Sequence, residues 1–199
     1  MNLDLNTILE VLGVTFNLLY LILLIKEQIV CWIFGIIGSL VSIWLFYRMQ
    51  LFSESILYVY YVIIGFYGYY TWNKRDKNNS VLAISEWKLP THGVSLAVAL
   101  IAGYGLGYYF DTYTEAQNAY FDAYTTVFSF LASYMEAKKI LSSWYFWIVI
   151  NGATIFLYSS RGLDIYSMLT IVYFLTSFIG YFNWRKKYST QINNSVATI

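Results

Sequence analysis

Three residues in the second half of the chain could bind a ligand together: Trp144, Trp147 and Asn151. They stand at i, i+3 and i+7 of the apolar stretch W-Y-F-W-I-V-I-N, so one face of a helix carries all three. Indole rings stack on flat or cationic rings, and an amide in a bilayer must bond a neighbouring helix or a ligand. The spacing therefore predicts part of a binding site.

Two alternatives stay open for these residues. Tryptophan favours membrane interfaces, and Trp32 and Trp144 both come early in apolar runs, so either could belong to an aromatic belt. Asn151 could instead join two helices, and Asn17 raises the same choice.

The composition predicts a membrane protein. Of the 199 residues 59% are hydrophobic and only 12% are charged, which leaves too little polar surface to cover a globule in water. A single cysteine, Cys31, excludes an intramolecular disulfide or a cysteine-based metal cluster within one chain. The start, MNLDLNT, lacks the basic residues of a signal peptide, so we expect the first apolar run to be retained as a helix.

Seven runs approach the roughly 20 apolar residues that a spanning helix needs: about 7–25, 29–47, 52–71, 91–110, 119–137, 142–158 and 164–183. Seven spans would put ten of the twelve basic residues on one face, leaving Arg48 and Arg161 on the other. Because basic loops stay inside, we expect an external N-terminus and a cytoplasmic C-terminus.

The chain also repeats itself. A shift of 112 residues aligns 32–72 with 144–184 without a gap, and 13 of these 41 positions are identical. This predicts an all-α integral membrane protein of two parallel three-helix repeats joined by a linker helix, a 3+1+3 plan. The expected parts are a first repeat (1–72), a cytoplasmic linker (73–90), the linker transmembrane helix (91–110), a second repeat (119–187) and a flexible tail (188–199).

The linker helix carries its own local signals. Pro90 suits a first helical turn. Gly103 and Gly107 allow close helix packing, either within the chain or between subunits.

Further polar and aromatic residues could complete the site between the repeats. The candidates are Thr125, Ser129 and Ser133 on one helix face, together with Asn17, Trp32, Tyr58 and Tyr61 of the first repeat. Aromatic walls with a few hydroxyls and an amide suit a flat cationic ring. We therefore expect a small-molecule ligand of that kind.

Catalytic and metal-binding motifs are absent from the sequence. The one histidine, His92, stands near a helix end, where an interfacial histidine is the default. No nucleic-acid module is indicated, and we expect neither enzyme activity nor a cofactor or metal. Since the predicted spans have no Asp, Glu, Lys, Arg or His near their centres, passive transport is the simpler hypothesis.

Several stretches resemble the PnuC family of vitamin transporters. They are Phe121–Asn151, Cys31–Gly38 (C-W-I-F-G-I-I-G), Tyr67–Trp72 (Y-G-Y-Y-T-W) and Leu157–Leu163 (L-Y-S-S-R-G-L). The resemblance implies the 3+1+3 fold, a bacterial inner-membrane location and a homotrimer surrounded by membrane lipid. It also implies facilitated diffusion of nicotinamide riboside, thiamine or riboflavin, followed by trapping through cytoplasmic phosphorylation.

The family's binding motif falls on Trp144, Trp147 and Asn151, with Thr125 and Ser129 nearby. Nicotinamide riboside members often have Gln at the positions of Tyr58 and Ser133, and Glu-Asn in place of Ser142-Ser143. These departures make thiamine the second candidate, ahead of riboflavin. A non-transporting membrane scaffold is the alternative from another class.

Overall fold

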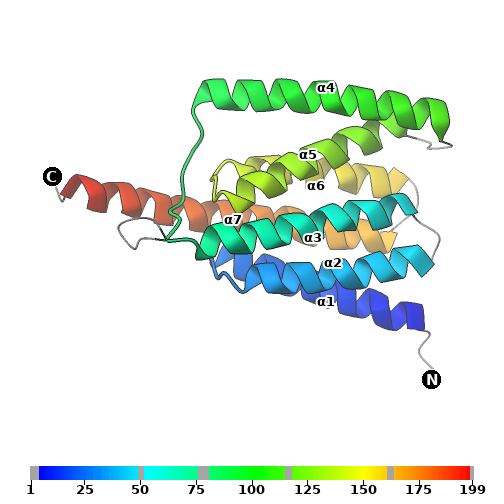
Figure 1. Ribbon diagram of the computed structural model, residues 1–199, viewed down its shortest axis with the longest axis horizontal. Coiled ribbons are helices and arrows are strands. Elements are labelled where there is room, and N and C mark those ends of the chain that lie inside the picture. The colour runs from blue at the N-terminus through cyan, green and yellow to red at the C-terminus, as the bar shows by residue number, and fades with distance from the viewer. Residues whose placement is uncertain (1–4, 49–51, 76–80, 115–117, 161–163, 198–199) are drawn as a thin grey trace. The chain divides into compact units, whose positions relative to one another are not determined.

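The computed structural model describes residues 5–48, 52–75, 81–114, 118–160 and 164–197. Arg161 and residues 76–80 of the predicted linker lie outside this part of the chain. Within it the chain forms seven α-helices and one isolated β-bridge (Figure 1). The prediction of an all-α chain with seven helices is confirmed.

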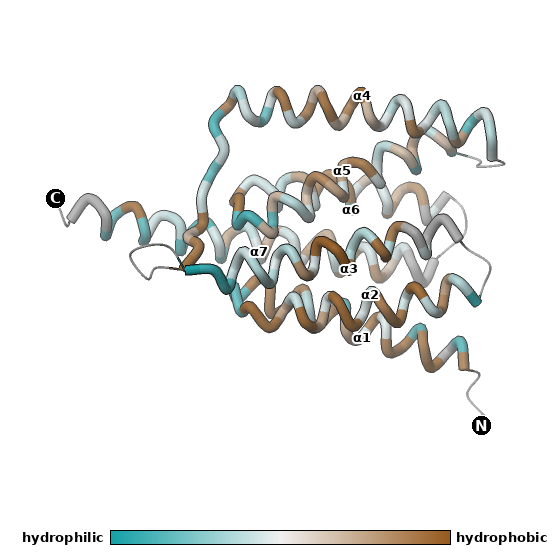
Figure 2. Tube along the Cα trace, in the orientation of Figure 1, coloured by the Kyte–Doolittle hydropathy of each residue, from teal (hydrophilic) through white to brown (hydrophobic). Residues whose placement is uncertain are grey.

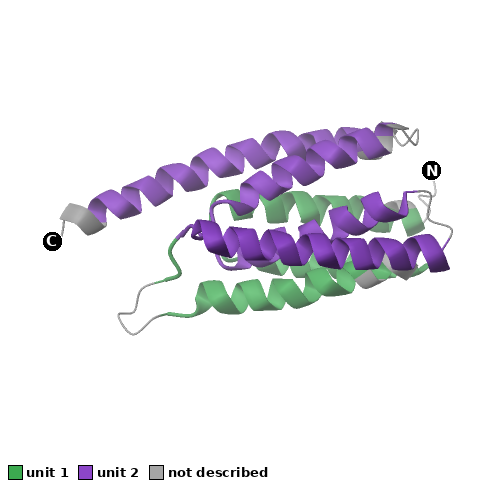
Figure 3. Ribbon diagram, turned by 90° about the horizontal axis from the view of Figure 1, so that it is seen from above, with its two compact units in different colours: residues 1–83 green, residues 84–199 purple. Residues whose placement is uncertain are grey.

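The chain divides into two compact units, residues 1–83 and 84–199, coloured separately in Figure 3. The first unit holds α1 (Leu5–Ile25), α2 (Cys31–Arg48) and α3 (Phe52–Asn73). In it α2 packs against both α1 and α3.

The second unit holds α4 (Leu89–Tyr113), α5 (Ala119–Ala137), α6 (Ser143–Ser160) and α7 (Asp164–Ala197). Each helix packs against the next along the chain. The division falls inside the predicted linker, and α4 joins the second unit.

The glycines of α4 explain that assignment. Gly103 and Gly107 are buried, and a methyl group on them would overlap the rings of Tyr124 and Tyr120 on α5. The sequence left open whether these glycines pack within the chain or between subunits. In the structure they pack within the chain. Pro90 lies in the first turn of α4, as predicted.

The helix bounds of the two units coincide at the 112-residue shift. Residues 31–48 and 143–160 form α2 and α6, and α3 and α7 begin at residues 52 and 164. The turns before α2 and α6 match as well: Glu27 and Lys139 have φ of 56° and 52°. Gln28 N donates to Leu23 O, and Ile140 N to Met135 O, both at 2.9 Å. These are the backbone bonds of a helix ending in a left-handed residue.

One tryptophan–glycine contact recurs in both units. Trp32 crosses Trp72 edge to face, with ring centroids 5.5 Å apart, and Trp144 crosses Trp184 at the same distance. A methyl group at Gly68 would overlap the Trp32 ring, and one at Gly180 would overlap Trp144. The rings thus fill the space that each glycine leaves open, which lets α3 approach α2 and α7 approach α6.

The last helix differs from the expected span and tail. Where the sequence predicted a span ending at 183 and a flexible tail from 188, α7 continues as one helix of 34 residues to Ala197. At 1.5 Å per residue it is about 51 Å long, well beyond a hydrocarbon core of roughly 30 Å. Figure 2 shows hydrophilic colours over much of its C-terminal part. No Gly or Pro follows Gly180, so nothing local stops the helix, and a helix satisfies its own backbone groups in water.

Apolar side chains are widely exposed on these helices. Among the described residues, α1 (over Ile8–Ile25), α2 and α4 are each long and apolar enough to cross a membrane, and Ser143–Leu157 in α6 is a shorter apolar stretch. Ile63, Val149 and Phe156 are 62%, 71% and 75% exposed. Exposure on this scale fits a lipid environment better than water.

We predict that Gly180→Ala lowers the melting temperature of the purified protein. The added methyl group must push the Trp144 ring out of its place, and overpacking of this kind costs about 1–3 kcal/mol. Gly105→Ala is the matched control, because no atom lies within 4 Å of the methyl group there. Equal melting temperatures for the two variants, measured in detergent, would contradict this account of the contact.

Candidate functional site

The α6 face predicted from the sequence begins with a fully enclosed ring. Trp144 is 0% exposed and packs on Gly180 and Trp184. Its counterpart Trp32 is 1% exposed and makes the same contacts with Gly68 and Trp72. Both indole N–H groups are buried without a hydrogen-bond partner. Within its own unit each ring therefore serves helix packing.

Trp147 breaks the pattern of equivalent residues. It is half-buried, and its indole N–H is buried without a partner. At the equivalent position of the first unit stands Gly35, whose open side is filled by Tyr20 of α1. The residue equivalent to Tyr20 is Ala132, which is fully buried. At this pair of positions the aromatic ring thus comes from α1 in the first unit (Tyr20) and from α6 in the second (Trp147).

Asn151 lies between two helices of the second unit. It is 9% exposed, and its amide nitrogen donates to the Ser177 hydroxyl of α7 at 3.2 Å. The equivalent residues of the first unit are Ser39 and Gly65, a pair that cannot form this bond because glycine has no side chain. Asn151 therefore does join two helices, through one end of its amide.

The hydroxyls of α5 form a ladder along their own helix. Thr125 donates to Phe121 O, Ser129 to Thr125 O at 2.7 Å and Ser133 to Ser129 O at 2.8 Å. Each hydroxyl proton is used within the helix, so these oxygens can offer only lone pairs to a ligand. Such an arrangement favours a ligand with hydrogen-bond donors.

The other candidates belong to the first unit. Asn17 is half-buried, and its side-chain oxygen lies against Gly38 of α2. Tyr58 contacts Phe46 and Tyr61 with ring centroids 5.3 and 5.6 Å apart. Six of the ten candidates thus lie on α5 and α6 of the second unit, and the other four, Trp32 among them, lie on α1, α2 and α3 of the first unit.

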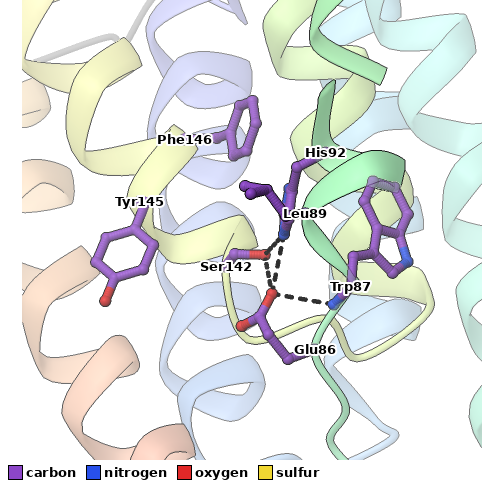
Figure 4. Close-up of a pocket in the computed structure, with 7 residues that line it drawn as sticks. All are labelled: Glu86, Trp87, Leu89, His92, Ser142, Tyr145 and Phe146. Carbon is purple, nitrogen blue, oxygen red and sulfur yellow. Dashed lines mark hydrogen bonds and ion pairs between the residues drawn. The ribbon is translucent and has the colours of Figure 1, made fainter. Parts of the chain in front are cut away.

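Sequence reasoning missed a cleft with mostly apolar walls where the linker meets the start of α6. It has a volume of about 390 Å³ and is lined by Glu86, Trp87, Leu89, His92, Ser142, Tyr145 and Phe146 (Figure 4). Ser142 donates to Glu86 Oε1 at 2.5 Å, and His92 Nε2 lies 3.1 Å from the same oxygen. The Trp87 backbone N–H also donates to it at 3.1 Å.

Backbone bonds hold the linker at this cleft. Ser85 N donates to Lys139 O at 3.0 Å, and Leu141 N donates to Ser85 O at 2.9 Å. Residues 84–87 are thereby fastened to the turn between α5 and α6. No local pattern could have indicated this, because the partners lie more than 50 residues apart in the sequence.

Glu86, His92 and Ser142 do not form a hydrolytic triad. In a triad the serine and the acid contact different nitrogens of the imidazole, whereas here Ser142 Oγ and Glu86 Oε1 both lie near Nε2, at 3.2 and 3.1 Å. Among the described residues no group of three His, Cys, Asp or Glu side chains could hold a metal ion. The hydrogen bonds of this cluster thus attach the linker to the start of α6 and to α4.

The chain was next compared with known proteins. The family model described as "Nicotinamide mononucleotide transporter" matches residues 7–186, most of the chain. The chain belongs to this family. The resemblance to PnuC proteins seen in the sequence is confirmed.

Individual PnuC proteins are distant in sequence and close in fold. The nicotinamide riboside transporter PnuC of Escherichia coli (strain K12) is 21% identical over 196 residues, covering 86% of this chain and 81% of that protein. The nicotinamide riboside transporter PnuC of Haemophilus influenzae (strain ATCC 51907 / DSM 11121 / KW20 / Rd) is 25% identical over 184 residues, covering 85% and 76%. The crystal structure of the vitamin B3 transporter PnuC has a TM-score of 0.75 at 21% identity, covering 92% of this chain and 82% of that one.

Membership of the PnuC family, together with the apolar helices, makes the chain a multi-pass membrane transporter. It is not an enzyme, which agrees with the prediction.

We predict that Glu86→Ala frees the linker while leaving the helices folded. The change removes the acceptor shared by Ser142, His92 and the Trp87 N–H. Amide hydrogen exchange at Ser85 and Leu141 should speed up about tenfold or more, because these bonds then open locally. Glu10→Ala, at an exposed carboxylate on α1, is the control. Unchanged exchange at both amides would show that Glu86 does not hold the linker.

Proposed function

We propose that the chain takes up a B-type vitamin with a flat cationic ring, in first place nicotinamide riboside, by facilitated diffusion. Phosphorylation of the vitamin in the cytoplasm would trap it and keep the gradient inward. The PnuC relatives, which are named as nicotinamide riboside transporters, support this choice.

The observation that carries the proposal is the unequal face of α6. Trp147 and Asn151 share a face, and the first unit has only Gly35 and Ser39 at the same places. A buried N–H without a partner costs about 1–3 kcal/mol, and Trp147 carries one. A ligand beside Trp147 can accept that N–H with an oxygen at the edge of the indole ring and can also bond Asn151, which offsets the cost.

The proposal includes the architecture around the site. Matching helix bounds, turns and Trp–Gly contacts support two parallel three-helix repeats joined by α4. With seven spans, the distribution of basic residues favours an external N-terminus and a cytoplasmic C-terminus. We extend the proposal to a homotrimer in a bacterial inner membrane.

Thiamine is the second candidate ligand. Ser142 is engaged with Glu86, and Tyr58 packs against Phe46 and Tyr61, at positions where nicotinamide riboside members carry other polar groups. Thiamine also has a flat cationic ring, so the aromatic walls suit both vitamins. Riboflavin, which lacks the cation, ranks third.

We predict that Trp147→Ala weakens vitamin binding at least about tenfold, since a desolvated cation–π contact is worth about 2 kcal/mol. Asn151→Ala should weaken binding as well, through the lost hydrogen bond. Tryptophan fluorescence titrations with nicotinamide riboside and with thiamine measure both effects. Trp44→Ala, at a 54% exposed ring on α2, is the control and should keep the affinity.

The same variants separate a carrier from a scaffold. A carrier loses binding while it keeps its elution volume in size-exclusion chromatography. If instead the wild type binds no vitamin and Asn151→Ala only lowers the melting temperature, the chain is a membrane scaffold and the proposal fails.

Facilitated diffusion leads to a prediction about driving force. The carboxylates Glu10, Asp122 and Glu136 stand within two turns of the helix ends, so the spans offer no proton relay at mid-membrane. Proteoliposomes should therefore equilibrate the vitamin at the same rate with or without an imposed pH gradient. Uphill accumulation driven by that gradient would exclude a passive carrier.

A further inference from the structure

In the hydrogen bond between Asn151 and Ser177 the donor and the acceptor can be assigned. Ser177 is 2% exposed, and its hydroxyl donates to the Tyr173 carbonyl at 2.7 Å. A serine hydroxyl has one proton, so this bond uses it. What the oxygen can offer Asn151 is a lone pair.

This assignment fixes the orientation of the Asn151 amide. Only its nitrogen carries protons, so the nitrogen must face Ser177, at the observed 3.2 Å. The opposite orientation would require Ser177 to give up its shorter, 2.7 Å bond to Tyr173. The amide oxygen is then the end that points away from α7.

The first unit has no such arrangement. Gly65 stands in the place of Ser177, and a methyl group there would lie 2.6 Å from Cγ1 of Ile36. An apolar side chain therefore occupies the region where the second unit has a hydroxyl. The oriented amide is a feature of the second unit.

We propose that Ser177 is a positioning residue: it holds Asn151 so that the amide oxygen faces the ligand, and the carrier thereby selects a vitamin that donates an N–H. This rests on the proposed function, because it assumes that Asn151 contacts the transported vitamin. The α5 hydroxyls, whose protons are used within their helix, add acceptors of the same kind. The carboxamide of nicotinamide riboside and the amino group of thiamine both supply such a donor.

The test compares two ligands that differ only in this donor. Nicotinamide riboside carries a carboxamide, and 3-acetylpyridine riboside has a methyl group in place of its NH₂ while keeping the cationic ring and the carbonyl. The purified wild type should bind the analogue at least about tenfold more weakly. If the wild type binds thiamine instead, the pair becomes thiamine and its analogue with hydrogen in place of the amino group.

In Ser177→Ala the amide is free to turn its nitrogen toward the analogue's carbonyl. The ratio of the two dissociation constants should therefore fall toward one, an effect that mere loss of stability would not produce. Thr176→Ala is the matched control: Thr176 lies on the same helix and its hydroxyl donates to the Val172 carbonyl at 2.7 Å, a bond of the same kind as that of Ser177, and the variant should keep the ratio.

Asn151→Asp gives a second test that does not depend on folding of Ser177→Ala. Aspartate keeps an oxygen toward the ligand, so preference for the N–H donor should persist. A wild-type ratio near one, an unchanged ratio in Ser177→Ala, or a reversed preference in Asn151→Asp would overturn the inference while leaving the carrier intact. Absence of binding of any of these vitamins by the wild type would overturn the proposed function, and this inference with it.

Discussion

The tryptophan–glycine contact is the constraint on which both units depend. In each unit a buried ring, Trp32 of α2 or Trp144 of α6, fills the space left by a glycine on the following helix. Lipid tails are as apolar as side chains, so burial from water does not drive helices together inside a membrane. Close van der Waals packing against a small residue is one of the forces that remain, together with interhelical hydrogen bonds, and here it sets how closely α3 approaches α2 and α7 approaches α6.

Because the two units share this contact, the equivalent positions at which their residues differ can be identified. The ring centroids of Phe16 and Phe34 lie 6.1 Å apart, and those of their equivalents Phe128 and Phe146 lie 6.2 Å apart. This part of the aromatic packing thus recurs in both units. Against it, Gly35 changes to Trp147, and the pair of Ser39 and Gly65 changes to Asn151 and Ser177. At these positions the second unit therefore has groups that can form directional hydrogen bonds.

Much of the fold could be read from the sequence because it follows from spacing. The 112-residue shift and the apolar runs anticipated the helices to within a few residues, since tryptophans and glycines that touch must keep their register. The attachment of the linker could not be anticipated in this way: Ser85 and Glu86 are held by residues 139–142 through long-range bonds with no periodic signal. The extension of α7 was missed because polarity marks the membrane boundary, while the helix ends only where its backbone bonding ends.

The candidate site, like the fold, could be predicted from the sequence only in part. Residue types and helical spacing put Trp147 and Asn151 on one face without any structure, yet they could not distinguish an amide that binds a helix from one that binds a ligand. In the structure the two ends of the Asn151 amide differ in their surroundings. The nitrogen of Asn151 is committed to Ser177, which satisfies the stability requirement of a buried amide. In the function proposed above the amide oxygen faces the ligand, so one residue would join two helices and also recognise a donor group of the vitamin.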